Sequence, residues 1–306
     1  MKVLIVGSNG LVGKALKSTL SQNKQIKHLV ASTRKDTNLF SLSQTTNLIK
    51  DVQPDILINA AAKVGGIYAN NTKRTEFILE NLKINTNLLE ASIQFNKMKI
   101  FNLGSSCIYP IDVENPIKET SIMTGRLEPT NSPYAMAKLT AIEIGNAISS
   151  QYGHKILNIM PTNLYGPNDN FSETDSHVIP GLILKMHKAK VENLSEFQIW
   201  GSGKPLREFL YVDDLANAIN FLLDKEVDQS LINIGSGKEI SIYDLALKIK
   251  KVVGFKGELQ FNSEMPDGIR RKLLDSSFIN SLGWKSKINL EDGLKMTYQW
   301  FENNYV

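Results

Sequence analysis

The chain has 306 residues and a formal net charge of +4, with 42% hydrophobic and 22% charged residues. These proportions are typical of a globular protein and exclude wholesale disorder. No apolar run approaches the ~18 residues of a membrane span, and no block of like charges is long enough to indicate nucleic-acid binding. The mild positive charge suits a small anionic ligand.

The N-terminus and the cysteine content bear on the compartment. The opening sequence MKVLIVGSNG indicates a first β-strand rather than a signal peptide, because glycines follow the short apolar run at once. Cys107 is the sole cysteine, which excludes an internal disulfide framework and a multi-cysteine metal site. We therefore expect a cytoplasmic protein with no bound metal and no membrane partner.

In the first half of the chain, short apolar runs alternate with helical patterns. We predict strands at Lys2–Val6, His28–Ser32, Asp55–Asn59, Lys99–Leu103 and Ile156–Met160. We predict helices at Leu11–Leu20, Ser43–Lys50, Thr72–Phe95 and Tyr134–Tyr152. Short apolar strands between helices indicate parallel βαβ units, so the predicted fold class is α/β with a doubly wound parallel sheet.

The second half of the chain is mixed. A loop at Tyr165–Asp175 precedes further predicted elements: a helix at Val178–Lys188, a strand at Glu208–Val212, a helix at Asp213–Leu223, a strand at Leu231–Ile234, and helices at Ile242–Val253 and Asn289–Asn304. We predict a Rossmann domain formed by residues 1–166 plus 206–235. Residues 167–205 plus 236–306 are expected to form a smaller, mixed α/β domain that binds the substrate.

The first predicted strand leads into a glycine-rich loop with GxxGxxG spacing: Gly7, Ser8, Asn9, Gly10, Leu11, Val12 and Gly13. Gly7 permits the tight turn, Gly10 lets the backbone approach a pyrophosphate, and Gly13 lets the helix pack closely on the strand. The free N–H groups of the first helical turn favour an anion there. The alternative is a strand-to-helix turn with no ligand, but the position and flanks favour a dinucleotide site.

The end of the second predicted strand indicates which dinucleotide binds. An acidic residue there would bind the ribose 2′-hydroxyl of NAD, but Asp36 comes only after Arg34 and Lys35. A guanidinium can hold a 2′-phosphate with two hydrogen bonds, so we predict that Arg34 selects NADPH. The alternative is a solvated pair of surface cations.

A tyrosine and a lysine at helical spacing indicate carbonyl reduction. Tyr134 and Lys138 are four residues apart and share one helix face. An ammonium beside a phenol favours the phenolate, and such a pair can pass a proton to a carbonyl oxygen. This pattern alone is weak, but Ser105, just after the fourth strand, can bind the same oxygen. The alternative is a helix start with an exposed lysine.

Several longer segments carry a family resemblance: NAAAKVGGIYANN (59–71), LGSSCIYP (103–110), LEPTNSPYAMAK (127–138), MPTNLYGPNDNF (160–171), SHVIPG (176–181), WGSGKPLREFLYVDD (200–214) and PDGIRRKLLD (266–275). Together they resemble the GDP-L-fucose synthase family of extended short-chain dehydrogenase/reductases. The resemblance covers nearly the whole chain. It implies an NADPH-dependent enzyme that epimerises GDP-4-keto-6-deoxy-D-mannose at C3 and C5 and reduces it at C4 to GDP-L-fucose.

The resemblance also implies roles for individual residues. Ser105, Tyr134 and Lys138 would form the reduction triad, and Cys107 and His177 the acid–base pair of epimerisation. Cofactor contacts beyond the glycine-rich loop and Arg34 are expected at Leu103, Gly104, Ser105, Lys138, Pro161, Thr162, Asn163, Leu164 and His177. The substrate contacts are expected at Lys185, Trp200, Arg207, Asp267 and Lys272. In this family the two long helices predicted at 72–95 and 134–152 usually pair across a two-fold axis, so a homodimer is expected.

The chemistry gives independent support for the epimerase pair. Protons at C3 and C5 flank the C4 ketone, so a base can remove them to form an enolate, and a thiolate and an imidazole can act at neutral pH. Without the resemblance, Cys107 would be read as a small buried hydrophobe and His177 as a solvated side chain.

Two departures from the family pattern keep alternatives open. Lys185 stands where the family usually has arginine, and Ser41 stands where aspartate is common near the adenine. One alternative is a GDP-4-keto-heptose C4-reductase of surface polysaccharide synthesis, with little or no epimerase activity. A second is a non-catalytic sensor of NADP(H) or a nucleotide sugar, against which the intact Ser105, Tyr134 and Lys138 argue.

Overall fold

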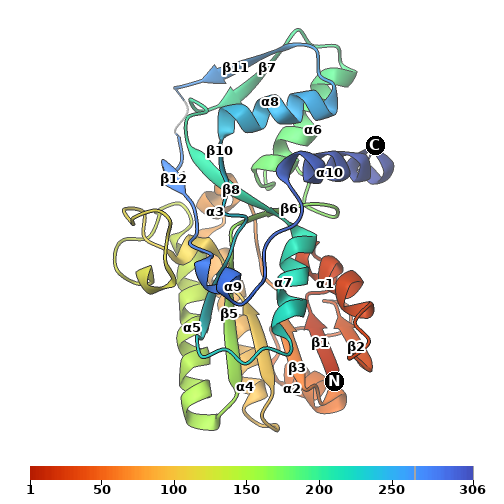
Figure 1. Cartoon of the computed structure of the whole chain (residues 1–306), viewed down its shortest axis with the longest axis vertical. Helices are drawn as coiled ribbons and strands as arrows, with labels where there is room; N and C mark the ends of the chain where they lie inside the picture. Colours follow the sequence, from red (N-terminus) through yellow and green to blue (C-terminus); the bar gives the residue numbers. More distant parts are fainter. Residues whose placement is uncertain (265–266, 306) are drawn as a thin grey trace.

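A six-stranded parallel sheet forms the larger half of the molecule (Figure 1). The computed structural model describes residues 1–264 and 267–305; Pro266, the first residue of the 266–275 motif, lies outside this part. The strand order is β2 (His28–Ser32), β1 (Lys2–Val6), β3 (Ile56–Asn59), β4 (Lys99–Leu103), β5 (Lys155–Pro161) and β9 (Leu231–Ile234). The chain reverses its direction of travel across the sheet between β1 and β3, and ligands of such sheets bind at that point.

The alternation of side chains along the strands divides the core into two layers. Val3 and Ile5 pack with α1 (Leu11–Ser21) and α7 (Val212–Leu222) on one face. Leu4 and Val6 face the opposite way. They pack against the helices α2 (Leu42–Val52), α4 (Arg74–Ser92) and α5 (Ser132–Tyr152). The strands are buried on both faces, so the predicted α/β class with a doubly wound parallel sheet is confirmed.

A smaller α/β region lies beyond the carboxyl ends of these strands (Figure 1). Its strand β8 (Leu206–Tyr211) pairs with β6 (Asn163–Tyr165), β10 (Glu239–Ser241) and β12 (Arg271–Lys272). A separate parallel pair joins β7 (Glu196–Trp200) and β11 (Glu258–Asn262). A second apolar core gathers these strands with α6 (Val178–Val191), α8 (Ile242–Val253) and α10 (Leu290–Tyr305).

Several element boundaries differ from the sequence prediction, and two of the differences change how the elements divide. The predicted helix at 72–95 is wrong at its start, because Lys73 leaves helical geometry and separates α3 (Ile67–Thr72) from α4. The strand predicted at 208–212 is wrong at both ends. The observed strand begins two residues earlier, at Leu206, and ends at Tyr211, because Val212 already begins α7.

The division of the chain into two domains remains a prediction. Most of the predicted Rossmann segment packs in the large sheet, whereas β8 lies in the small one. The C-terminal segment contains α9 (Ser277–Ser281), whose Ile279 and the following Trp284 pack into the core of the large sheet. In the part of the chain that the structure describes, no helix is long and apolar enough to cross a membrane.

Candidate active site

The glycine-rich loop has the shape that a dinucleotide pyrophosphate requires. Gly7 has φ +76°, and a Cβ there would lie 2.5 Å from the backbone nitrogen of Ala61 at the end of β3. A Cβ on Gly13 would lie 2.2 Å from the Gly7 carbonyl oxygen. Gly10 caps α1, whose first turn at Leu11 and Val12 carries no acidic side chain. The N–H groups of this helix start are therefore available to an anion.

A pocket of about 240 Å³ adjoins this loop. Its walls come from the ends of β1, β2 and β3, the 37–40 loop and Ile84. Gly7, Asn9 and Gly10 contribute to it, whereas Ser8 is buried and its hydroxyl donates to the Ser32 carbonyl at 3.0 Å. The pocket lies where the sheet order reverses, which is the expected place for the adenosine half of the cofactor.

Arg34 lines this pocket, and the nearby acidic residue is already engaged. The Asp36 carboxylate accepts hydrogen bonds from the backbone N–H of Thr33 at 2.8 Å and its hydroxyl at 2.6 Å, which lower the pKa of Asp36. The Arg34 guanidinium is largely exposed, 3.9 Å from Glu80 and 5.5 Å from the centre of the Phe40 ring. A largely exposed guanidinium, held only by a long ion pair to Glu80 beside this pocket, fits a cofactor that carries a 2′-phosphate.

The phenol of Tyr134 meets the Ser105 side chain. Tyr134 lies in the first turn of α5, and its ring packs edge-on against Phe77 with centroids 6.3 Å apart. Burial raises the pKa of Tyr134, a negative charge on Cys107 would act in the same direction, and a hydrogen bond with Ser105 opposes both. The phenol therefore stays protonated at neutral pH, as a proton donor requires.

Lys138 is buried one turn further along α5. Its ammonium donates to the Leu103 carbonyl at 2.6 Å and lies 5.9 Å from the centre of the Tyr134 ring. Burial lowers the pKa of Lys138 to about 8. The expected lowering of the Tyr134 pKa by this ammonium is not found: burial raises that pKa, and the group that opposes burial is Ser105.

The other predicted cofactor contacts gather at the ends of β4 and β5. Leu103 and Gly104 end β4, and a Cβ on Gly104 would lie 2.1 Å from Met160 in β5. Pro161 ends β5 and leads to β6, where Leu164 packs into the apolar core of the large sheet. Two further side chains hold this connection to β8, since Thr162 Oγ1 and Asn163 Nδ2 donate to the Glu208 carbonyl at 3.2 and 2.8 Å.

Cys107 lies in a short 3₁₀ turn that follows β4 (Ser106–Ile108). Its backbone N–H donates to Ser105 Oγ at 3.2 Å, which ties it to the reduction residues. Its sulfur accepts from Asn131 Nδ2 at 3.5 Å and from Lys272 Nζ at 3.8 Å. Together with Tyr134, Cys107 belongs to one small cluster of packed side chains.

His177 immediately precedes α6. Its side chain is open to solvent, yet the surrounding protein is dense enough that desolvation lowers its pKa, so the ring lies in a concave part of the surface. Backbone packing fixes this place: Gly66 N–H donates to the Asp175 carbonyl at 3.0 Å, and a Cβ on Gly66 would lie 2.3 Å from the Ser176 oxygen. Among the described residues, the His177 ring makes no hydrogen bond to Cys107 or Tyr134.

Two of the predicted substrate cations are neighbours. Arg207 in β8 and Lys272 in β12 are register partners of parallel strands, so their side chains leave the same face. Burial lowers the pKa of Arg207, whereas the negative charges of Asp267 and Cys107 act in the opposite direction. The Asp267 carboxylate accepts from the backbone and hydroxyl of Ser202, and these bonds lower its pKa.

The remaining two predicted substrate residues form a separate pair. The Lys185 ammonium lies 5.5 Å from the centre of the Trp200 ring, and both side chains are exposed. A cation beside an open aromatic face can accept a planar base and a neighbouring phosphate. The Ser41 side chain, at the departure from the family pattern, accepts from Gln44 N–H and caps α2.

One residue at the reaction centre has no signal in the sequence pattern. Asn131 stands three residues before Tyr134, and only the fold brings its amide to the Cys107 sulfur. No cluster of three or more potential metal ligands occurs within residues 1–264 and 267–305.

The comparisons with known proteins agree with this geometry. The model of the "NAD dependent epimerase/dehydratase family" matches residues 3–235. The chain belongs to this family. A putative GDP-L-fucose synthase 2 of Arabidopsis thaliana is 47% identical over 305 residues, covering 100% of this chain and 93% of the relative. The GDP-L-fucose synthase of Escherichia coli is 43% identical over 312 residues, covering 99% and 97%.

Solved structures of this epimerase/dehydratase family share the whole fold. A GDP-L-fucose synthetase from Naegleria fowleri, bound to NADP, superposes with a TM-score of 0.90 at 30% identity, covering 99% of this chain and 94% of that one. The predicted resemblance to GDP-L-fucose synthases is therefore confirmed.

Proposed function

We propose that this chain is an NADPH-dependent epimerase-reductase that converts GDP-4-keto-6-deoxy-D-mannose to GDP-L-fucose. The observation that carries the proposal is that Cys107 packs against the side-chain cluster that contains Tyr134, while its backbone N–H donates to Ser105 Oγ at 3.2 Å. A base and a ketone-binding phenol are the two groups that epimerisation beside a carbonyl followed by its reduction demands. Full-length identity of 43–47% to GDP-L-fucose synthases supports the same assignment.

Epimerisation uses the acidity of the carbons beside the ketone. The Cys107 thiolate takes a proton from C3 or C5, the C–H electrons pass toward O4, and an enolate forms. Tyr134 and Ser105 donate hydrogen bonds to that oxygen and stabilise its charge. His177, in its concave site before α6, returns a proton to the opposite face of the carbon. Each proton removed is thus replaced, and the carbon changes configuration.

Reduction uses the same oxygen. NADPH, when bound, would supply a hydride for C4. Tyr134 gives its proton to O4 as the alcohol forms. Burial holds Tyr134 in the protonated form that this step needs. Lys138 is tied to the Leu103 carbonyl and holds α5 against the end of β4. By the family resemblance, its ammonium would also bind the nicotinamide ribose.

The nucleotide end of the substrate extends toward the small region. Arg207 and Lys272 neutralise the diphosphate from adjacent strands, and Lys185 adds a third positive charge from α6. The open face of Trp200 stacks with the guanine base. Asp267, placed by Ser202, accepts a hydrogen bond from the nucleotide.

The test is an assay of NADPH oxidation with GDP-4-keto-6-deoxy-D-mannose in D₂O. We expect deuterium at C3 and C5 and a product that NMR identifies as GDP-L-fucose. Reduction of a GDP-4-keto-heptose without exchange at C3 or C5 would instead establish the heptose C4-reductase. Binding of NADPH with no oxidation by any GDP-keto sugar would establish a sensor.

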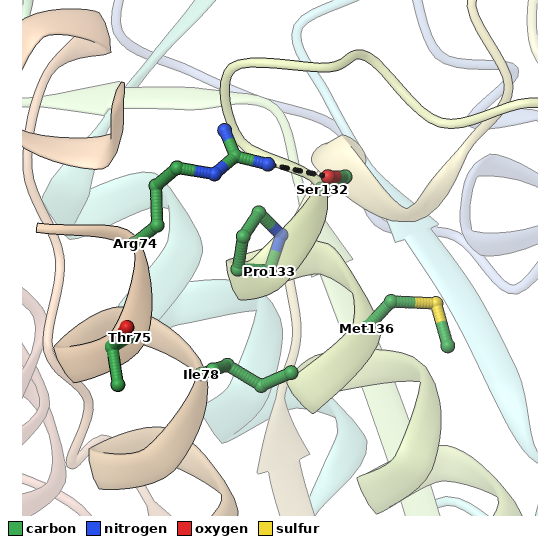
Figure 2. A pocket seen from close by; sticks show the side chains of 6 residues that line it. All are labelled: Arg74, Thr75, Ile78, Ser132, Pro133 and Met136. Carbon is green, nitrogen blue, oxygen red and sulfur yellow. Dashed lines mark hydrogen bonds between the residues drawn. The ribbon is translucent and has the colours of Figure 1, made fainter. Parts of the chain in front are cut away.

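A homodimer built on α4 and α5 completes the proposal. These helices lie side by side, and an open pocket of about 350 Å³ between their first turns is lined by Ile78, Pro133, Met136, Arg74, Thr75 and Ser132 (Figure 2). Leu79 and Met136 remain exposed on these helices. A second copy would bury them, and light scattering of the purified protein measures the mass.

We also propose a cytoplasmic location, testable by cell fractionation.

A further inference from the structure

The Cys107 sulfur has an uncharged donor that the proposed reaction leaves without a role. Asn131 Nδ2 lies 3.5 Å from it, in addition to the Lys272 ammonium at 3.8 Å. The Tyr134 phenol and the Arg207 guanidinium also lie within electrostatic range of this sulfur. A sulfur that receives N–H donors is better suited to the thiolate than to the thiol.

The Asn131 side chain does not form the capping hydrogen bond that is usual at the start of a helix. It is the N-cap residue of α5, where an asparagine side chain ordinarily accepts a backbone N–H of the first turn. Here its side chain makes no such bond and its amide turns toward Cys107. Its buried Oδ1 has no hydrogen-bond partner within the described residues. Both features lower the stability of the fold, and such local losses concentrate at functional positions.

The loop before α5 holds Asn131 in this orientation. The Glu128 carboxylate accepts the backbone N–H of Asn131 at 3.1 Å. From α4, the Arg74 guanidinium donates to the Pro129 carbonyl at 2.8 Å, and its bond to the Ser132 hydroxyl is visible in Figure 2. These hydrogen bonds hold the loop in place, so the amide of Asn131 stays next to the Cys107 sulfur.

We propose that Asn131 is a positioning residue of the epimerase half-reaction, whose amide N–H fixes the Cys107 sulfur and favours its thiolate. The inference rests on the proposed function. A neutral donor stabilises the thiolate without adding a second cation, so the sulfur remains basic enough to take a carbon-bound proton. When the proton moves to sulfur, the C–H pair passes to the enolate, and the amide stays in place.

The chain offers a clean readout, because Cys107 is its only cysteine. The rate of alkylation by iodoacetamide at neutral pH then reports one thiolate. We expect Asn131→Ala to slow alkylation roughly tenfold, and the isosteric Asn131→Asp to slow it further through repulsion. A role in packing alone would leave the isosteric variant close to the wild type.

Thr130→Val is the matched control, because within residues 1–264 and 267–305 the Thr130 hydroxyl bonds to Glu128 of the same loop and not to Cys107. It should disturb the loop and leave alkylation within about twofold of the wild type. Unchanged or faster alkylation in both Asn131 variants would overturn the inference. Slowing by Thr130→Val equal to that by Asn131→Ala would also overturn it, because the loop and not the amide would then be responsible.

A second measurement separates this inference from the proposed function. Deuterium exchange at C3 and C5 should fall with alkylation in the Asn131 variants, while reduction of an already epimerised substrate changes little. If the wild type exchanges no deuterium but the variants still alkylate slowly, the epimerase function fails and the amide–sulfur link stands. If the wild type exchanges deuterium and the variants do so equally fast, Asn131 has no part in the step.

Discussion

The Lys138 ammonium donates to the Leu103 carbonyl at 2.6 Å, and this bond joins the helix that carries Tyr134 to the strand that leads to Ser105. Lys138 is almost completely buried, without a carboxylate partner among its hydrogen bonds in the described residues. Its charge therefore lacks compensation until anionic ligands arrive. The uncompensated buried charge of Lys138 gives the site a measurable pH dependence.

The first prediction concerns that charge. Burial lowers the pKa of Lys138 to about 8, whereas Tyr134 stays protonated well above that pH. If the reaction needs the ammonium, kcat/KM for reduction should be level below pH 8 and fall as the pH rises through it. A profile level up to pH 10 would show that the charge of Lys138 is dispensable.

The free energy of unfolding should rise over the pH range in which kcat/KM falls. Between pH 8 and the ordinary lysine value of 10.5, the unfolded chain binds a proton at Lys138 that the folded chain has lost. The wild type should therefore gain stability over this range relative to Lys138→Met, by up to about 3 kcal/mol. Urea unfolding of both proteins at pH 7, 8.5 and 10 measures the gap. A constant gap would show that Lys138 keeps its proton when buried.

Much of the fold could be predicted because the strands of the large sheet are short apolar runs. The strands at Lys2–Val6 and Lys99–Leu103 have the predicted bounds, since glycines end their apolar runs. The small strands were missed. β7 and β11 pair with each other across some 60 residues of chain, and β12 has only two residues, so no local pattern marks them.

Some residues of the candidate site could also be predicted from the sequence, and others could not. Tyr134 and Lys138 are predictable because helical spacing fixes their shared face. The pairing of Arg207 with Lys272 depends on the register of two distant strands, and the family resemblance alone named both residues. Asn131 escaped prediction because its contact with Cys107 joins two loops. Contacts between two loops leave no regular spacing of residues from which the sequence could predict them.

The second prediction separates two glycines of the phosphate loop. Gly13→Ala would place a Cβ 2.2 Å from the Gly7 carbonyl, so the helix must move away from the strand. We expect the free energy of unfolding to fall by about 2 kcal/mol or more. Gly10→Ala is the matched control, because a Cβ there would lie 3.7 Å from that same oxygen, an ordinary contact distance.

Gly10→Ala should change stability by less than about 1 kcal/mol but weaken NADPH binding, because its Cβ occupies the approach of the pyrophosphate. Urea unfolding and fluorescence titration with NADPH measure the two effects separately. Equal stability of both variants would contradict the close packing at Gly13, and undiminished NADPH affinity of Gly10→Ala would contradict the placement of the pyrophosphate.

The third prediction concerns the choice of cofactor. Arg34 lines the adenosine pocket, and the Asp36 carboxylate is held by Thr33. Arg34→Leu should raise the KM for NADPH roughly 10- to 100-fold, because a charge-assisted bond to the 2′-phosphate is lost, and leave the KM for NADH nearly unchanged. Lys35→Ala, which removes the adjacent exposed cation, is the control. Equal losses with both cofactors would refute selection by Arg34.

The last prediction separates the two halves of the reaction. The Tyr134 phenol lies near Ser105, where we propose that both bind the carbonyl oxygen, whereas the Cys107 sulfur accepts from Asn131 and Lys272. Cys107→Ser replaces a thiolate with a hydroxyl that is a far weaker base at neutral pH. Exchange of deuterium at C3 and C5 should fall at least ~100-fold, a typical loss for a general base. Reduction of a substrate supplied already epimerised should stay within a few-fold of the wild-type rate. Tyr134→Phe should abolish reduction and also slow the exchange, because the same phenol stabilises the enolate oxygen. Full conversion of GDP-4-keto-6-deoxy-D-mannose by Cys107→Ser would remove the sulfur from the mechanism.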